Sequence, residues 1–98
     1  MKTGIEGRRD WFLYVLECTG GTLYTGISTD VARRFEQHRI GKGARYTRAR
    51  PPLRLLASFQ FDSQSQALIA EVAFKKLRAA AKRKCCGDAS IAMAEAHD

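Results

Sequence analysis

The stretch LYTGISTDVARRFEQH, residues 23–38, contains the most informative pattern in the chain. A short apolar segment with a glycine leads into three residue types that commonly begin helices. From there Val31, Phe35 and His38 follow the i, i+4, i+7 spacing of an amphipathic helix. Arg34 lies four residues before His38, so the two side chains are about 40° apart around the helix and share a face.

The ends of this helix are also marked in the sequence. We expect Ser28 or Thr29 to be the N-cap, with Asp30 in the first turn, where a carboxylate complements the helix dipole. Gly41 follows the last periodic residue and is typical of a helix end. The helix is therefore predicted to begin near residue 30 and to end at Gly41.

A hairpin is expected before the helix. The run DWFLYVLEC, residues 10–18, is rich in aromatic and branched side chains, which indicates a strand buried on both faces. The TGGT that follows is a turn signal, and residues 23–27 form the returning strand. A two-residue turn at its glycines would put Tyr14 and Tyr24 on opposite faces, whereas a bulge or a three-residue loop would put them on one face.

The second half predicts a strand and one or two helices. The breakers in GKGARYTRARPP, residues 41–52, exclude regular structure throughout that segment, and its two prolines end it. A third strand is expected over residues 53–61. Ser63 and Gln66 have the spacing of a capping box at the start of the next helix.

This last helix runs toward residue 84, with a break expected near Leu77 and a natural stop at Gly87. The elements together predict one small α/β domain over residues 10–84. The predicted order of elements is β-β-α-β-α, or β-β-α-β-α-α if the last helix is broken in two. The helices flank a three-stranded sheet. Residues 1–9 and 88–98 are expected to be flexible termini.

Positive charge dominates the composition. Seventeen Lys and Arg residues face ten acids in 98 residues, a net charge of +7. Residues 31–54 carry eight basic residues and one acid, and residues 75–84 carry six basic residues and no acid. Such a distribution attracts polyanions, of which nucleic acid is the usual one, although a solvated basic face has the same composition.

The composition also excludes several classes. There is no apolar run long enough to span a membrane and no signal-type segment, so we expect a cytoplasmic protein without a membrane partner. The three cysteines, Cys18, Cys85 and Cys86, are odd in number and lack C-x-x-C spacing. They are expected to be reduced thiols and not zinc ligands.

The ordered motifs resemble the GIY-YIG nuclease superfamily, in particular its small stand-alone bacterial members. The first signature is present as FLY, residues 12–14, and the second as YTG, residues 24–26. The helix then matches the family pattern of hydrophobic, Arg, hydrophobic, His. SQSQALIAEVAFKKL, residues 63–77, is similar to the segment that carries the family's metal-binding glutamate, here Glu71. Phe12 replaces the first signature glycine, and Ile27 stands where some members have lysine.

This resemblance implies a metal-dependent endonuclease that hydrolyses DNA, with a role in repair or in processing branched structures. The implied ion, Mg²⁺ or Mn²⁺, is bound by Glu71, whose hard oxygen suits it. Arg34 is a planar donor that fits phosphate oxygens. The candidate general bases are Tyr24, His38 and Tyr14; we expect Tyr24 and His38 to manage the proton, with Tyr14 in support.

The segment after the helix is a candidate nucleic-acid interface. Lys42, Arg45 and Arg48 can follow a phosphate backbone, and Tyr46 offers a ring on which a base can stack. The expected partner is nucleic acid, with DNA favoured over RNA. The protein is expected to be a monomer.

Each candidate also has an ordinary structural explanation. Tyr14 is in an apolar strand, where tyrosine is commonly a core residue. Tyr24 can simply close a hairpin, and Tyr46 can pack on the domain. Glu71 can pair with Lys75 at i+4 as helix support.

Two other functions fit the same composition. One is a nucleic-acid-binding module that kept the fold but does not cleave, which predicts salt-sensitive binding without hydrolysis. The other is a protein-interaction subunit whose basic blocks meet an acidic partner, which predicts only weak, nonspecific attraction to nucleic acid.

Overall fold

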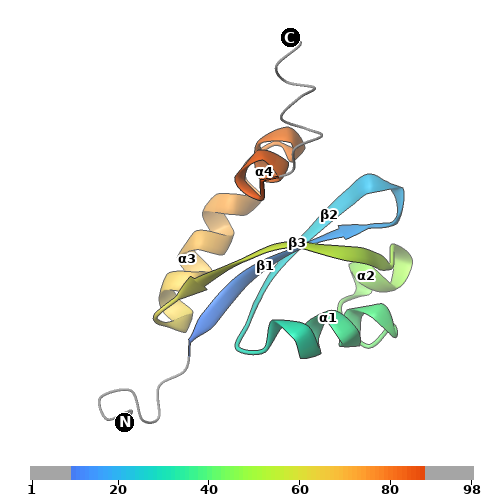
Figure 1. Ribbon diagram of the computed structural model, residues 1–98, viewed down its shortest axis with the longest axis horizontal. Coiled ribbons are helices and arrows are strands. Elements are labelled where there is room, and N and C mark those ends of the chain that lie inside the picture. The colour runs from blue at the N-terminus through green and yellow to red at the C-terminus, as the bar shows by residue number, and fades with distance from the viewer. Residues whose placement is uncertain (1–9, 88–98) are drawn as a thin grey trace.

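Three antiparallel strands form a sheet in the order β2-β1-β3, and helices cover it on both faces (Figure 1). The computed structural model describes residues 10–87, so the expected flexible termini lie outside the described residues. The predicted α/β fold and its order are confirmed, with one additional short helix. The elements are β1 (Trp11–Cys18), the 3-10 turn η2 (Thr19–Gly21), β2 (Thr22–Ser28), α1 (Val31–Arg39), α2 (Arg45–Ala49), β3 (Pro52–Phe61), α3 (Gln64–Lys75) and α4 (Ala79–Cys85).

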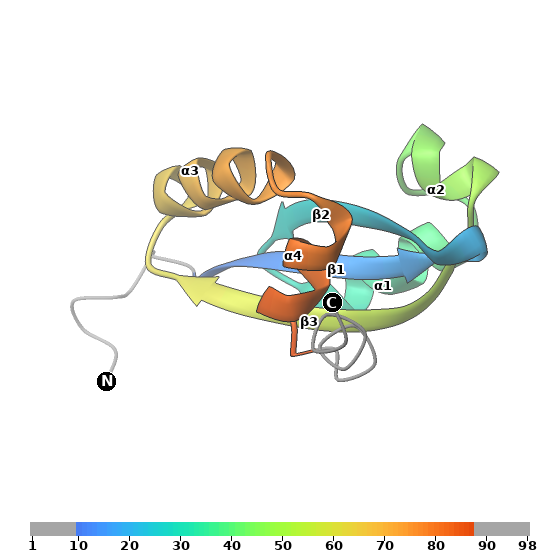
Figure 2. The same cartoon turned by 90° about the horizontal axis from the view of Figure 1, so that it is seen from above.

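β1 is apolar except at Glu17, as suits a middle strand that is covered on both faces. Leu13 and Val15 point to one face, where they pack against Phe74 of α3. Tyr14 and Leu16 point to the other face, toward α1. Figures 1 and 2 show α3 and α1 on different sides of the strands. The period-2 alternation of a strand therefore sends successive β1 residues into two separate cores.

The hairpin between β1 and β2 closes with a three-residue loop, one of the two arrangements predicted to put Tyr14 and Tyr24 on one face. Gly20 and Gly21 both have positive φ, 85° and 78°, a conformation that glycine adopts without steric cost. The loop sets the register so that Leu16 pairs with Tyr24 and Tyr14 pairs with Gly26. Directly paired residues share a face, so Tyr14 and Tyr24 point the same way.

The cap of α1 differs from the prediction. Asp30, and not Ser28 or Thr29, is the N-cap: its backbone is extended and its Oδ1 accepts a hydrogen bond from the N–H of Arg33 at 3.0 Å. Ser28 cannot serve because its hydroxyl accepts from the N–H of Asp30 at 2.9 Å. The predicted end is confirmed, since the helix stops at Arg39 and Gly41 has a φ of 84°.

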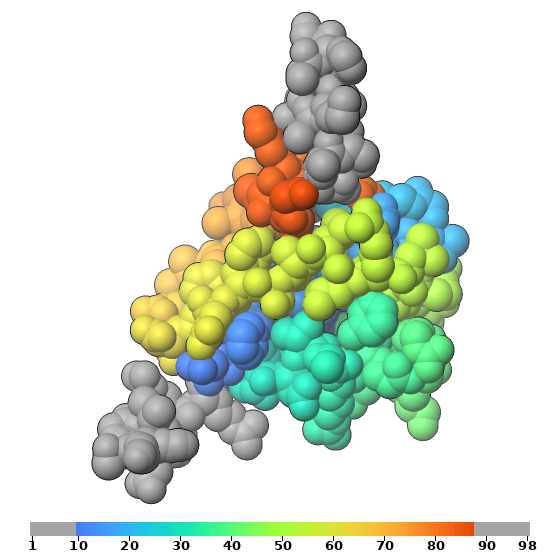
Figure 3. Space-filling view, viewed as in Figure 1, coloured from blue at the N-terminus to red at the C-terminus, as the bar shows by residue number. Residues whose placement is uncertain are grey.

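The segment at 41–52 is more regular than expected. Residues 45–49 form α2, in which the N–H of Arg48 donates to the carbonyl of Ala44 at 3.1 Å. The glycines before it and the prolines after it limit this helix to five residues. Pro52 already belongs to β3, one residue earlier than predicted, and β3 crosses the face of the molecule seen in Figure 3 between α1 and α4.

Two helices complete the chain. Ser63 caps α3 by accepting from the N–H of Gln66 at 3.2 Å, but the Gln66 side chain accepts from the N–H of Asp62 and not from that of Ser63, so the capping box is only half formed. The break expected near Leu77 separates α3 from α4. Within residues 10–87, no helix is long and apolar enough to cross a membrane.

An ion-pair network joins α4 to the hairpin. Arg83 is 8% exposed; its Nη1 lies 2.9 Å from Glu17 of β1, and its Nη2 donates to the carbonyl of Gly21 at 2.7 Å. Arg54 of β3 also donates to Glu17, at 2.7 Å. These hydrogen bonds, Arg54 first, lower the pKa of Glu17. One arginine of the second basic block is thus a structural residue.

The cap gives a first prediction. Asp30→Ala removes the acceptor for the N–H of Arg33 and should lower the free energy of unfolding by about 1 kcal/mol. Asp62→Ala is the matched control, because Asp62 is an exposed acid beside the cap of α3, and it should change stability by less than about 0.5 kcal/mol. Urea unfolding monitored by circular dichroism measures both. Equal effects would remove the capping role from Asp30.

Candidate functional site

A buried hydrogen bond joins the middle strand to α1. The hydroxyl of Tyr14 lies 2.9 Å from Nε2 of His38, and the two residues are 1% and 0% exposed. The phenol reaches this position by crossing over β2 at Gly26. A Cβ at Gly26 would lie 2.5 Å from the Tyr14 hydroxyl oxygen, so only glycine fits there. The signature glycine therefore makes room for the signature tyrosine.

Two residues behind His38 were not among the sequence-based candidates. Thr47 of α2 is fully buried, and its Oγ1 lies 2.7 Å from Nδ1 of His38. Gly43 packs directly on the imidazole, since a Cβ there would lie 2.1 Å from the same Nδ1. A threonine in a basic segment and one glycine among several carry no distinctive sequence signal, so only the structure identifies them.

Tyr24 lies among the other aromatic rings on this face. Its ring centroid is 5.0 Å from that of His38, 6.4 Å from that of Tyr14 and 5.8 Å from that of Tyr46. Tyr24 is half-buried. The three-residue hairpin loop is what places Tyr24 beside Tyr14, because a shift of one residue would turn it to the α3 face.

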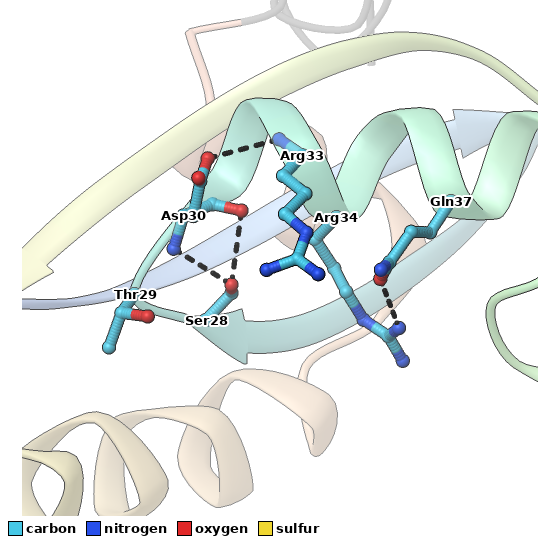
Figure 4. A pocket seen from close by; sticks show the side chains of 6 residues that line it. All are labelled: Ser28, Thr29, Asp30, Arg33, Arg34 and Gln37. Atoms are coloured by element: carbon cyan, nitrogen blue, oxygen red, sulfur yellow. Dashed lines mark hydrogen bonds between the residues drawn. The ribbon is translucent and has the colours of Figure 1, made fainter.

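Arg34 borders a shallow, open pocket at the start of α1 (Figure 4). Its Nη1 donates to Oε1 of Gln37 at 2.8 Å, which restrains the guanidinium. Figure 4 shows Arg33 and Arg34 projecting toward the same side of the helix. Two arginines and one carboxylate, that of the cap Asp30, line the pocket, so its net positive charge suits an anion such as a phosphate. It is lined by Ser28, Thr29, Asp30, Arg33, Arg34 and Gln37.

Charges from both faces of the sheet act on the Tyr14 hydroxyl. Burial, followed by repulsion from Tyr24, raises the pKa of Tyr14 to about 12; the Arg34 guanidinium opposes this rise, and the Glu71 carboxylate adds to it. Arg34 comes from α1 and Glu71 from α3. Burial, with a contribution from Arg34, lowers the pKa of His38, so its imidazole is neutral at pH 7.

Glu71 is the one candidate metal ligand. Its side chain is 16% exposed, and a carboxylate oxygen lies 3.2 Å from Nζ of Lys75, so the i+4 pair is formed. Within residues 10–87, no three His, Cys, Asp or Glu side chains gather as a ready-made metal cluster. One carboxylate fits Mg²⁺ or Mn²⁺ that keeps most of its waters and also contacts substrate phosphate, and it does not fit a closed zinc site.

The candidate nucleic-acid residues lie around α2. Lys42, Arg45 and Arg48 are exposed. Tyr46 is 38% exposed while its ring contacts Tyr24, so it packs on the domain and still presents part of its surface to solvent. The same short helix thus presents Arg45 and Arg48 to solvent, while its Thr47 is buried against His38.

The packing behind His38 gives a second prediction. Gly43→Ala places a methyl group inside the distance that real Cβ atoms keep from a ring, so the backbone or the imidazole must move. We expect a loss of about 1–3 kcal/mol in unfolding free energy and shifted NMR signals for His38. Lys42→Ala, one residue earlier and exposed, is the control. A Gly43→Ala variant as stable as that control would show that the loop yields without cost.

The chain matches the GIY-YIG catalytic domain over residues 10–84. It is 60% identical over 78 residues to the UPF0213 protein Reut_B5558 of Cupriavidus pinatubonensis, covering 80% of this chain and 87% of that protein. It is 49% identical over 70 residues to the UPF0213 protein VNG_2274C of Halobacterium salinarum, covering 71% and 91%.

Two solution structures are similar in fold. The UPF0213 protein BH0048 of Bacillus halodurans is 42% identical, with a TM-score of 0.51 over 80% of this chain and 83% of that one. The protein EF2693 of E. faecalis is 38% identical, with a TM-score of 0.55 over 79% and 82%. The sequence match, these relatives and the arrangement of both signatures around one face of the sheet agree, and the chain belongs to the GIY-YIG family.

Proposed function

We propose that this protein is a metal-dependent endonuclease that hydrolyses phosphodiester bonds in DNA. The observation that carries the proposal is the convergence of opposite charges on one phenol. The charges of Arg34 and Glu71, which belong to helices on opposite faces of the sheet, both act on the pKa of the Tyr14 hydroxyl, and that hydroxyl is hydrogen-bonded to a neutral histidine. A cation for the phosphate, an acid for a metal and a proton acceptor are the parts that this reaction needs.

Arg34 binds the phosphate in this proposal. Its guanidinium offers parallel N–H donors to two phosphate oxygens. The bond to Gln37 holds it in place before substrate arrives, so little side-chain freedom is lost on binding. Mg²⁺ or Mn²⁺ at Glu71 would supply further positive charge and a bound water of lowered pKa.

Tyr14 and His38 carry the proton. With a pKa of about 12 the phenol is protonated at neutral pH, so it can donate to Nε2 of His38 whenever that nitrogen carries the lone pair. As water attacks phosphorus, its proton passes to the Tyr14 oxygen while the Tyr14 proton passes to Nε2. The phosphorus–oxygen bond to the leaving group breaks, and solvent protonates the leaving oxygen.

Tyr24 supports this pair. The 2.9 Å contact favours Tyr14 over Tyr24 as the direct partner of His38, although all three were candidate bases. Tyr24 packs against both rings and is the more accessible phenol. Its place in the proposal is to hold the rings and to line the approach of substrate.

A non-catalytic nucleic-acid-binding module is the second candidate function. The observation that favours it is the Glu71–Lys75 ion pair, which occupies the carboxylate that a metal needs. Such a pair with an exposed lysine stabilises a helix only weakly, so a divalent ion can displace it. Cleavage assays on single-stranded, duplex and branched DNA with Mg²⁺, Mn²⁺ or a chelator separate the two functions, since the module binds all of them without metal-dependent cleavage.

Glu71→Gln should abolish metal-dependent cleavage and leave the fold and most of the DNA affinity intact. An amide keeps the volume but is a far poorer ligand for a hard cation. Glu36→Gln, at an exposed acid paired with Arg39, is the control and should cleave at the parent rate. Undiminished cleavage by Glu71→Gln would take Glu71 out of the reaction.

Arg34→Lys should lower the single-turnover cleavage rate at least ~10-fold, because a point charge cannot replace a planar donor at a phosphate. Arg39→Lys retains a surface ion pair on the same helix and should leave the rate unchanged. If Arg34→Lys also cleaves at the parent rate, Arg34 belongs to a solvated face.

Neutralising Arg45 and Arg48 together should weaken DNA binding regardless of sequence. The slope of log affinity against log salt should become shallower by up to ~2 units, about one for each lost phosphate contact. The rate at saturating DNA should change little, because Arg34 and Glu71 are intact. An unchanged slope would show that α2 faces away from DNA. A collapsed rate with intact binding would show that the active site extends into α2.

A further inference from the structure

We infer that Thr47 is the positioning residue that fixes the tautomer of His38, so that the Nε2 lone pair faces the Tyr14 hydroxyl. This inference rests on the proposed function, because it explains how His38 is kept ready to accept the Tyr14 proton. It assigns a role to α2 that is separate from its exposed cations.

The hydrogen bonds of the Thr47 hydroxyl determine the tautomer. A hydroxyl has one proton to donate. Oγ1 of Thr47 lies 2.9 Å from the carbonyl oxygen of Ala44, which can only accept, so the Thr47 proton is used there. The contact of 2.7 Å between Oγ1 and Nδ1 of His38 must then be donated by Nδ1–H. A neutral imidazole with its proton on Nδ1 has its lone pair on Nε2.

One contact favours the other tautomer. The N–H of Ala44 lies 3.4 Å from Nδ1 and could donate to it if that nitrogen were unprotonated. At 3.4 Å this bond is long for N–H···N, whereas the Thr47 contact is 0.7 Å shorter and within the ordinary range. The shorter contact therefore dominates.

The imidazole cannot escape this arrangement by turning. Gly43 lies against Nδ1 and the neighbouring carbon from behind, and Tyr14 contacts Nε2 from the front. His38 and Thr47 are both 0% exposed, so no bulk water can replace either partner. Gly43 and Thr47 thus hold the ring from one side while the phenol approaches from the other.

The proton transfer explains why Thr47 and Gly43 need to hold the His38 ring in one orientation. His38 can take the Tyr14 proton only if Nε2 carries a lone pair, and in the opposite tautomer Nε2–H points at the phenol and blocks the transfer. When Nε2 gains the proton, Nδ1–H still donates to Thr47, so the imidazolium keeps both of its hydrogen bonds.

The resting protein tests the tautomer directly. Nitrogen-15 NMR of histidine-labelled protein at pH 7 should show His38 with Nδ1 protonated and Nε2 unprotonated. The signals of the other histidine, His97, are identified by their absence from the spectrum of a His97→Gln variant. This measurement needs neither DNA nor metal. A protonated Nε2 would overturn the inference, even if the protein is a nuclease.

Two substitutions test the consequence for the reaction. Thr47→Val keeps the shape but removes both hydroxyl bonds. It should mix the two tautomers and lower the single-turnover rate at least ~10-fold, which is part of the ~10²–10⁴-fold that a proton-transfer group contributes. Thr47→Ser keeps the hydroxyl and should restore the parent spectrum and a rate within ~3-fold. DNA affinity should be unchanged in both, because Arg45 and Arg48 remain.

The outcomes separate the inference from the proposed function. Parent-like tautomer and rate in Thr47→Val would overturn the role of Thr47 while leaving the nuclease proposal standing. If the parent cleaves no DNA, the proposed function fails, and the spectra of the parent and of Thr47→Val still decide whether Thr47 sets the tautomer. If Thr47→Val does not fold, the parent spectrum carries the test, because a protonated Nε2 overturns the inference by itself.

Discussion

The hydrogen bond between Tyr14 and His38 is the contact on which the arrangement of this site depends. It joins the middle strand of the sheet to α1, and its two side chains are almost completely buried. Because both partners are polar and buried, losing either one would leave the other unsatisfied, at a cost of about 1–3 kcal/mol. The bond therefore fixes how α1 sits on the sheet, and with it the position of Arg34. Gly26 is the other half of the same constraint, since only a residue without Cβ lets the phenol cross β2.

This geometry explains how residues from opposite faces of the sheet can act at one point. α1 packs on the Tyr14 face and α3 on the Leu13 face, yet both Arg34 and Glu71 influence the pKa of Tyr14. β2 is an edge strand, so the two faces of the sheet meet beside it. Because Gly26 has no side chain, the Tyr14 phenol can lie over this strand, close to the edge. In the proposed reaction, the carboxylate on one side would hold the metal and the guanidinium on the other would bind the same phosphate, which neither helix could do alone.

The sequence predicted the parts with strong local signals. The central strand, the helix that carries Arg34 and His38, and the break near Leu77 all follow from periodicity and breakers, and the structure confirms them. Requiring Tyr14 and Tyr24 to share a face predicted either a bulge or a three-residue loop, and the structure has the loop. The cap of α1 was missed because Ser28, Thr29 and Asp30 are all good caps, and only the bond from the Asp30 N–H to Ser28 decides among them. The residues behind His38 were missed because long-range packing, and not local pattern, defines them.

The central claim is that α1, β1 and α3 form one metal-assisted site at the Tyr14 hydroxyl. Its most direct measurement is paramagnetic broadening of the NMR signals by substoichiometric Mn²⁺. The account predicts the strongest broadening at Glu71, Tyr14 and Gly26, on elements that are distant in sequence, and its loss in the Glu71→Gln variant. Broadening centred on another acid, such as Glu36 or Asp62, or broadening at Glu71 that leaves Tyr14 and Gly26 unaffected, would contradict it.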